Sequence, residues 1–383
     1  MRSVHQAPDA GPLTAGRGRR DPSTTNGGIR VWHRKCPAGT WEVARQLPHP
    51  ALRPGVLQYR GFRMDLGGSR RRLELPSGSV TVVFNFGRPL RVTCASSGRV
   101  LASSSAPVVA GMLTRPSIGE HSGRLHGMEV ALQPWAAFRL FDTPMRELAD
   151  AMAPADPVIG ARCQILSDAL AEAPGWPERF ALLDTALRLW TETGATPCPR
   201  TIHAWDQLRA SGGTVPVREL ATSTGWSERH LERRFLEQIG LSPKGAGRVL
   251  RLRQALTMMA EGKSSADVAM GCRFYDQAHF NREFKAMTGH APSRFMAIRT
   301  LGGSGPPAVD RLEGQVTSAV RTPEGSPDAV VRRQGPAQCD RARKPRSRVL
   351  RRDDAVVHYE QPVKEGSAPT GRSPTAMGCG RGS

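Results

Sequence analysis

The sequence Ser227-ERHLERRFLEQIGLS-Pro243 returns in altered form as Asp276-QAHFNREFKAMTGHA-Pro292, 49 positions further along the chain. Six positions of the two stretches carry identical or similar residues: His230, Leu231, Arg233, Phe235, Gly240 and Pro243 correspond to His279, Phe280, Arg282, Phe284, Gly289 and Pro292. Self-similarity at a fixed distance usually means that one structural unit is used twice. The duplication therefore decides how this region is expected to fold.

Each copy predicts a capped, amphipathic helix. Ser227 and Asp276 are good N-caps, and helix-favouring residues follow both. Gly240 and Gly289 stand where the end of a helix favours a left-handed residue. Apolar residues four positions apart predict one inward-facing stripe on each helix: Leu231 and Phe235, and then Phe280 and Phe284.

The residues around the copies complete two helix-turn-helix motifs. A short segment with a small central residue precedes each copy: Ala221 in the first and Ala269 in the second. This small residue would let the two helices of each motif approach closely. Between the copies, Ser242 and Pro243 predict the start of a long helix that runs to about Glu261. A helix of roughly 18 residues spans about 27 Å. This length could hold two reading helices about one duplex turn, roughly 34 Å, apart on DNA.

Residues 201–299 resemble the DNA-binding domain of the AraC/XylS family of bacterial transcription regulators. The resemblance rests on the paired motifs, on the run Arg253-QALTMM and on the closing sequence Phe284-KAMTGHAPSR-Phe295. It implies seven helices in two helix-turn-helix subdomains joined by a linker helix. One position departs from the family pattern: Arg273 precedes Phe274 where the family usually has glycine, and a non-glycine residue would strain the turn if it needs positive φ.

The resemblance also implies which residues reach DNA and which partners the protein has. The residues expected at base edges are Arg229, Glu232 and Arg233 in the first recognition helix and Gln277, His279 and Arg282 in the second. The expected partners are a double-stranded DNA operator and RNA polymerase, with a small-molecule effector and a second copy of the chain as further candidates. No cofactor is expected.

Composition supports nucleic-acid binding only weakly. The 54 lysines and arginines outnumber the 34 aspartates and glutamates, which gives a formal net charge of +20. Such an excess favours polyanions. However, the charge is spread along the chain, and the abundance of arginine, glycine and proline is also what a GC-rich genome would produce.

Cysteine spacing and hydropathy indicate a cytoplasmic protein. The seven cysteines form no C-x-x-C pair, which argues against a disulfide framework and a zinc cluster. No apolar run approaches the roughly 20 residues that cross a bilayer, so no membrane association is expected. The first 28 residues also lack the apolar core of a signal peptide.

The chain is expected to have an α+β organisation in five parts. Residues 1–40 and 301–383 are rich in Gly, Pro and Arg and are predicted to be disordered. Residues 41–155 predict a β-rich sensor or dimerisation domain, with the clearest strands at 55–66, 79–86, 90–95 and 126–134. Residues 156–200 predict a helical connector, and residues 201–300 predict the all-α tandem helix-turn-helix domain.

Two signals in the β-rich segment have alternative interpretations. Glu120, His121 and His126 contain the residue types of a cupin-like metal site, but no H-x-H pair accompanies them, so we expect no metal. Trp135, Phe138 and Phe141 could line an effector pocket, although such spacing is more typical of core packing.

Two other functional classes compete with a transcription regulator. A DNA-repair methyltransferase can carry an AraC-like segment, but Cys36, Cys94 and Cys163 are too far apart for its zinc site. An architectural or RNA-binding basic protein would not need duplicated, capped helices. The sequence therefore predicts a sequence-specific DNA-binding transcription regulator that is not an enzyme and is modulated by a small molecule through its N-terminal domain.

Overall fold

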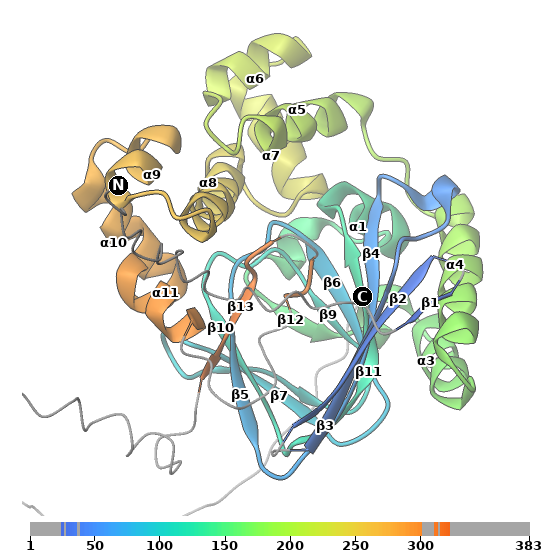
Figure 1. The fold of residues 1–383 in the computed structure, drawn as a ribbon. Coiled ribbons are helices and arrows are strands. Elements are labelled where there is room, and N and C mark those ends of the chain that lie inside the picture. The colour runs from blue at the N-terminus through green and yellow to red at the C-terminus, as the bar shows by residue number, and fades with distance from the viewer. Residues whose placement is uncertain (1–23, 27, 37–38, 301–309, 313–314, 322–383) are drawn as a thin grey trace, which may run out of the picture. The chain divides into compact units, whose positions relative to one another are not determined.

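The computed structural model describes residues 24–26, 28–36, 39–300, 310–312 and 315–321. All of them fall in one compact unit, residues 1–333, and residues 334–383 lie outside the described part. The described residues combine an antiparallel β-domain with a helical region (Figure 1). The predicted α+β fold class is confirmed.

Two antiparallel sheets make up the β-domain. The first sheet has the spatial order β1 (Thr24–Asn26), β2 (Ile29–Cys36), β3 (Gly39–Gln46), β4 (Val56–Leu66), β11 (Arg124–Leu132), β6 (Val80–Asn85), β9 (Val108–Ala110) and β12 (Met152–Pro154). The second has the order β13 (Ser318–Arg321), β5 (Arg70–Glu74), β10 (Ser117–His121), β7 (Leu90–Cys94) and β8 (Val100–Ser104).

The central strands form where the sequence predicts them. Strands β4, β6, β7 and β11 overlap the four segments singled out above. Every residue of β6 is buried, because its Val80-TVVF run is covered on both faces. Pairing of β11 with both β4 and β6 makes this part of the sheet the centre of the β-domain core.

The prediction of a disordered segment over residues 1–40 is wrong for its last part. Residues Ile29–Cys36 form β2, which pairs with β3 from Arg30↔Arg45 to Cys36↔Gly39. A Gly/Pro/Arg-rich composition does not reveal this pairing, because it depends on a partner strand elsewhere in the chain. Residues 1–23 of the predicted segment lie outside the described residues.

The prediction of a disordered tail over residues 301–383 is also wrong in part. Residues Ser318–Arg321 form β13, which pairs with β5, and Ser318 and Ala319 are fully buried. The physical reason is again long-range: four residues without apolar periodicity are ordered by a sheet edge far away in sequence. Residues 301–309, 313–314 and 322–383 of the predicted tail lie outside the described residues.

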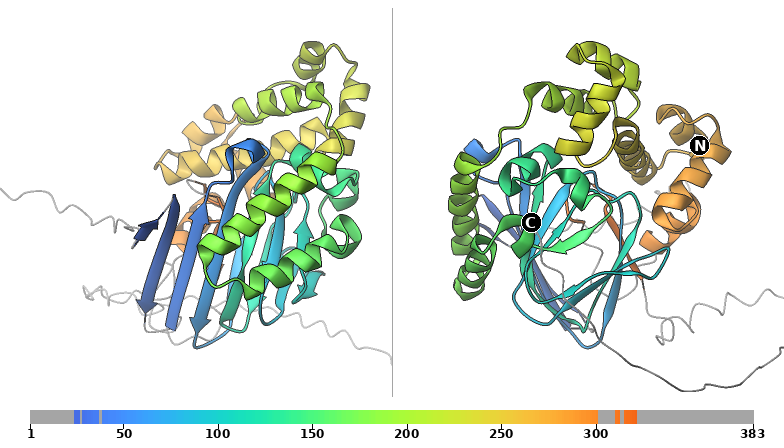
Figure 2. Two further views of the ribbon diagram at one scale, coloured as in Figure 1. Left: turned by 90° about the vertical axis from the view of Figure 1, so that its right-hand side faces the viewer. Right: turned by 180° about the vertical axis from the view of Figure 1, so that it is seen from behind.

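Helical segments follow β11, and the first two of them come before β12. They are α1 (Pro134–Phe141), the short 3-10 helix η2 (Met145–Leu148), α2 (Asp156–Ile159), α3 (Arg162–Glu172) and α4 (Trp176–Thr193), and a 3-10 helix, η1 (Pro50–Leu52), precedes β4. Figure 2 shows α3 and α4 lying against one face of the first sheet. Trp176 of α4 packs so closely on β4 that a Cβ atom at Gly61 would lie 2.3 Å from its ring. Residues 156–200 therefore cover the sheet as well as connecting two regions.

Seven helices form within residues 199–300, as the family resemblance implied. They are α5 (Pro199–Ala210), α6 (Val217–Thr224), α7 (Glu228–Gln238), α8 (Pro243–Ala260), α9 (Ser265–Gly271), α10 (Gln277–Thr288) and α11 (Pro292–Thr300). Their buried residues belong to the same apolar cluster as the β-domain core. Among the described residues, none of the helices is both long and apolar enough to cross a lipid bilayer.

Candidate nucleic-acid interface

The first helix-turn-helix consists of α6 and α7. The Ser227 hydroxyl caps α7 by accepting a hydrogen bond from the His230 N–H at 3.2 Å. Leu231 and Phe235 are fully buried, which fixes the inward stripe that their spacing predicts. The opposite side of α7 is therefore free to face a ligand.

The second helix-turn-helix, α9 and α10, has stronger caps. Ser264 and Asp267 form a reciprocal capping box at the start of α9. The Asp276 carboxylate caps α10 by accepting from the His279 N–H at 2.6 Å. Phe280 and Phe284 are buried at the positions equivalent to Leu231 and Phe235. The duplication seen in the sequence is thus a duplication of structure.

The turns of the two motifs share one backbone conformation. Gly225 ends α6 with φ 67°, and Arg273, which stands 48 positions later, has φ 52°. In both turns the next residue closes the helix end: the Trp226 N–H donates to the Ala221 carbonyl at 3.0 Å, and the Phe274 N–H to the Ala269 carbonyl at 2.9 Å. The second turn does need positive φ, and it places an arginine there.

Five of the six residues expected at base edges are exposed. On α7 they are Arg229, Glu232 and Arg233, and on α10 they are Gln277 and Arg282. The sixth, His279, is half-buried. Its ring packs edge-on against Phe274, with ring centroids 5.5 Å apart, and its Nδ1 accepts from the Tyr275 N–H at 3.3 Å. His279 therefore also helps to hold the turn of the second motif.

The first recognition helix has a parallel arrangement. The His230 ring lies 4.7 Å from that of Trp226, and a guanidinium nitrogen of Arg233 lies 3.3 Å from its Nδ1. Arg234 is instead paired along the helix with Glu237 at 2.7 Å. Arg229 and Arg233 are thus the exposed arginines of this helix, and neither has a carboxylate partner among the described contacts.

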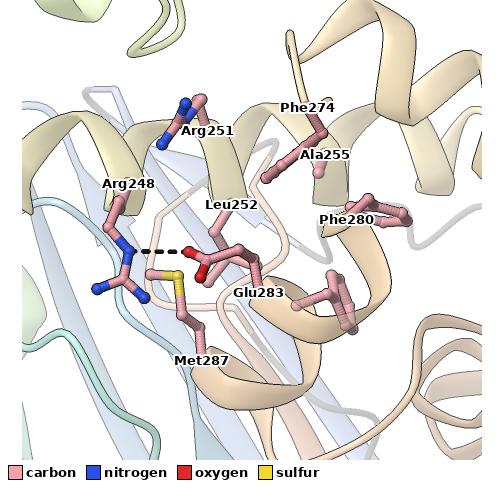
Figure 3. Close-up of a pocket in the computed structure, with 9 residues that line it drawn as sticks. Arg248, Arg251, Leu252, Ala255, Phe274, Phe280, Glu283 and Met287 are labelled. Atoms are coloured by element: carbon pink, nitrogen blue, oxygen red, sulfur yellow. Dashed lines mark hydrogen bonds and ion pairs between the residues drawn. The ribbon is translucent and has the colours of Figure 1, made fainter. Parts of the chain in front are cut away.

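Helix α8 holds the second recognition helix by polar and aromatic contacts. Figure 3 shows the Arg248 guanidinium turned toward Glu283 of α10, with 2.8 Å between Nε and the carboxylate. The Arg251 guanidinium lies 5.5 Å from the centre of the Phe274 ring. Burial lowers the pKa of Arg251, and Glu283 opposes that shift. The space left between α8 and α10 is a cavity of about 10 Å³, room for about one water molecule, so this joint is packed and is no ligand site.

One exposed residue beside the second recognition helix was not singled out from the sequence. Tyr275 is 92% exposed and immediately precedes the N-cap of α10. An aromatic residue between a turn and an N-cap is the signal that could have identified it. Its position makes it a candidate for contact with whatever α10 binds.

The residues considered for a metal site lie on two different sheets. Glu120 and His121 are on β10, whereas His126 is on β11 between the rings of Phe86 and Trp176. Burial lowers the pKa of His121 to about 4, and Arg70 and Arg72 add to the effect. Within the described ranges, no three His, Cys, Asp or Glu side chains are grouped to hold a metal ion.

The aromatic residues of α1 belong to the core. Phe141 is buried, and Trp135 and Phe138 are half-buried against the same apolar cluster. This arrangement supports the core-packing interpretation of their spacing. A cavity of about 470 Å³ lies elsewhere, beside β2, β3 and β4.

Comparison with known families separates the chain into the same two regions. Residues 220–298 match the family described as a helix-turn-helix domain, and residues 44–154 match a domain of unknown function (DUF6597). The second match covers most of the β-domain but assigns it no role.

Two curated proteins are similar to this chain over a part of its length. The uncharacterized HTH-type transcriptional regulator YidL of Escherichia coli (strain K12) is 37% identical over 94 residues, 24% of this chain and 30% of its own length. The uncharacterized HTH-type transcriptional regulator YbfI of Bacillus subtilis (strain 168) is 35% identical over 65 residues, 17% of this chain and 24% of its own. The chain thus spans less than a third of either relative.

Among solved structures, ToxT from Vibrio cholerae is similar at 12% identity and a TM-score of 0.37, covering 65% of this chain and 100% of that one. A likeness this weak carries no structural argument. The fold and the sequence matches nevertheless define a class: residues 199–300 form a tandem helix-turn-helix domain. Within that class the domain is of the AraC type, and both curated relatives are named as transcription regulators rather than enzymes.

Proposed function

We propose that this protein is a sequence-specific DNA-binding transcription regulator that reads two successive major-groove segments with α7 and α10. The observation that carries the proposal is the structural duplication. Two capped helices bury equivalent stripes, and each exposes an arginine at the equivalent position, Arg233 and Arg282. Arginine is well suited to guanine O6 and N7 and to phosphate.

The linker helix supports two simultaneous contacts. Helix α8 has 18 residues, which corresponds to about 27 Å. Val249, Leu252 and Leu256 are buried along it, so α8 is a helix packed into the core rather than an exposed linker. A linker helix of this length suits two recognition helices that lie about one duplex turn, roughly 34 Å, apart.

The remaining parts of the proposal follow from the role of a regulator. The operator is double-stranded DNA, RNA polymerase is the machinery that the protein would affect, and the cytoplasm is where both are found. Modulation by a small molecule through the β-domain and formation of a homodimer belong to the proposal as well. Arg229, Glu232, Gln277 and His279 are proposed as the other residues at base edges.

The test is a binding site selected in vitro from random duplexes, followed by affinity measurement with the full chain. Arg233→Ala and Arg282→Ala should each weaken binding by on the order of 1–3 kcal/mol. Each variant should also relax the preference in only one half of the selected site, because the two helices contact different groove segments.

Two variants serve as matched controls. Arg234→Ala removes the neighbouring arginine of the same helix, which pairs with Glu237, and Arg188→Ala removes an exposed arginine of α4. Both should leave the preferred sequence unchanged. Unaltered affinity in both Arg233→Ala and Arg282→Ala would disprove the assignment of the two recognition helices.

A further inference from the structure

The turn of the second helix-turn-helix is one residue longer than the turn of the first. Gly225 and Arg273 hold equivalent places in the two turns, 48 positions apart. The N-caps that follow them, Ser227 and Asp276, are 49 positions apart. The additional residue is Tyr275, which immediately precedes the N-cap of α10 and is 92% exposed. The two motifs thus differ at their turns, although their recognition helices are equivalent.

The residue at the start of the second turn has an unfavourable backbone conformation. Among the described residues, three that are not glycine have positive φ: Asp142, Asp150 and Arg273. Aspartate tolerates the left-handed region because its short polar side chain can bond to the nearby backbone, but arginine gains no such compensation. Residues held in this region occur preferentially at sites that contact a ligand, where the strain is part of the function.

The contacts within the protein do not explain this arginine. Arg273 is exposed, and its guanidinium group has no ion pair or hydrogen bond among the contacts of the described residues. Glycine would adopt the same backbone conformation without strain. The first turn carries glycine although it has space for a side chain, because a Cβ atom at Gly225 would meet no heavy atom within 4 Å. The physical reason for Arg273 is therefore to be sought in a binding partner.

The residue between Arg273 and Tyr275 anchors the turn. Phe274 points toward α8 (Figure 3), and the Arg251 guanidinium lies 5.5 Å from the centre of its ring. On the side of α10, the ring centroids of His279 and Phe280 lie 5.5 and 5.3 Å from that of Phe274. The Tyr275 N–H donates to His279 Nδ1 at 3.3 Å. The backbone of the turn is thus fixed on α10, while the two side chains beside Phe274 are exposed.

The way in which helix-turn-helix motifs dock on DNA assigns a different environment to each of these side chains. The first helix of the motif crosses the phosphate backbone, and the N-terminal residues of the second contact base edges in the major groove. Arg273 follows the C-cap of α9, so it lies on the side of the phosphates. Tyr275 precedes the N-cap of α10, so it lies on the side of the base edges.

We propose that Arg273 and Tyr275 form an additional DNA contact of the second helix-turn-helix, in which Arg273 binds a backbone phosphate and the Tyr275 ring packs on the C5 methyl group of a thymine. The guanidinium group is well suited to phosphate, and the thymine methyl is the apolar group that base pairs present in the major groove. The inference rests on the proposed function, because it requires α10 to enter that groove. The shorter turn of the first motif has no counterpart of either side chain.

The first experiment tests whether Arg273 trades stability for DNA affinity. The full chain carrying Arg273→Gly is measured on the site selected from random duplexes. We expect the affinity to fall about fivefold at about 0.15 M salt, and the slope of log affinity against log salt to lose about 0.9, the contribution of one phosphate contact. The melting temperature should not fall, because glycine relieves the left-handed conformation. A residue with a purely structural role would change stability and affinity in the same direction.

Three further variants separate charge from backbone strain. Arg273→Lys keeps the positive charge and should keep most of the salt slope. Asp142→Gly relieves a left-handed residue at the end of α1, outside the DNA-binding domain, and Arg188→Gln removes an exposed positive charge from α4. Both of these controls should keep the salt slope of the wild type.

The second experiment tests the contact of Tyr275 with a thymine methyl. The half of the site contacted by α10 is the half in which Arg282→Ala relaxes the sequence preference. Each thymine of that half is replaced in turn by deoxyuridine, which removes only the C5 methyl group. One replacement should lower the affinity of the wild type about fourfold, the effect of one buried methyl-sized group. Tyr275→Ala should be insensitive to that replacement, whereas Tyr275→Phe should respond like the wild type because the ring makes the contact.

Four results would overturn the inference. The first two are a wild-type salt slope in Arg273→Gly and a joint fall of its melting temperature and DNA affinity. The third is equal sensitivity of Tyr275→Ala and the wild type to every deoxyuridine replacement. The fourth is intact DNA binding in both variants with a loss of transcription control, which would assign this surface to a protein partner.

The same measurements separate this inference from the proposed function. Failure of the wild type to select any site, or an unchanged affinity in Arg282→Ala, would count against α10 as a recognition helix. Weakened binding in Arg282→Ala, together with wild-type behaviour of Arg273→Gly and Tyr275→Ala, would reject this inference alone.

Discussion

The two helix-turn-helix units have nearly the same internal construction but different attachments to the rest of the chain. Both recognition helices start at a side-chain cap and bury two apolar residues four positions apart. The first unit ends in buried residues, Gln238 to Leu241, and the approach at Gly240 is so close that a Cβ atom there would lie 2.8 Å from the Met145 carbonyl of η2. The end of the first recognition helix is therefore packed directly against η2, which lies between β11 and β12.

The second unit shares the apolar cluster of the protein and is held by separate polar contacts as well. Arg248 of α8 binds Glu283 of α10, and Arg299 of α11 binds Asp310, which comes after α11 in the chain. Polar contacts of this kind depend on ionic strength and on competing ligands, unlike close packing. The second unit therefore has polar attachments, which ionic strength weakens, in addition to its apolar packing.

The largest effects should come from the buried phenylalanines that both units share. Phe235→Ala and Phe284→Ala should each lower the free energy of unfolding by about 3–5 kcal/mol, because each creates a cavity in a continuous apolar cluster. Urea unfolding followed by far-UV circular dichroism and tryptophan fluorescence measures this loss. Leu189→Ala, at a site that is 55% exposed, is the control and should change stability little.

The shape of these transitions tests whether the units differ in cooperativity. One transition for both probes is expected in each variant, because the cluster joins the helical region to the β-domain. A separate early transition in Phe284→Ala alone would mean that the second unit unfolds by itself. That result would sharpen the comparison, since the second unit would then be an independent domain held only by its polar contacts.

Much of both helix-turn-helix units could be predicted from the sequence, because the sequence signals that define their helices are local. N-caps, apolar residues four apart and the closing glycines act within one or two helical turns, and they identified α7 and α10 correctly. The exposed positions of Arg233 and Arg282 follow from the same periodicity.

The attachments could not be predicted, because they join residues that are far apart in sequence. Strand β13 forms only because β5 offers an edge, and Arg311 is ordered by Glu74 and Glu129, more than a hundred residues earlier. Composition pointed to disorder for both β2 and β13. Likewise, no pattern in the sequence brings Arg30, Arg45 and Arg53 to one cavity wall.

The turns provide a second test of the comparison, with an intermediate effect. Gly225 and Arg273 have the same left-handed conformation, which costs a non-glycine residue roughly 1–2 kcal/mol. Gly225→Arg should therefore destabilise the protein by about 1 kcal/mol, and Arg273→Gly should stabilise it by a smaller amount, because glycine also gains freedom in the unfolded chain. Thermal and urea unfolding measure both changes.

A third substitution separates backbone strain from the size of the introduced side chain. Asn tolerates the left-handed region better than most residues, so Gly225→Asn should be closer to the wild type than Gly225→Arg. If Gly225→Asn and Gly225→Arg are equally destabilised, the turns differ in packing rather than in backbone strain.

The smallest effect concerns the ion pairs that distinguish the two units. Arg248 and Glu283 join two helices at 2.8 Å, whereas Arg234 and Glu237 pair within α7 at 2.7 Å. Both pairs are partly exposed, so a double-mutant cycle should give a coupling of about 0.2–1 kcal/mol for the first and about 0.2–0.5 kcal/mol for the second. Both couplings should shrink at about 1 M salt, where the screening length falls to roughly 3 Å.

Only the pair between helices sets the direction of a recognition helix. Glu283→Ala should therefore weaken DNA binding more than Glu237→Ala does, even where the two lose equal stability. Equal losses of DNA affinity would mean that packing against α8, rather than this ion pair, orients α10.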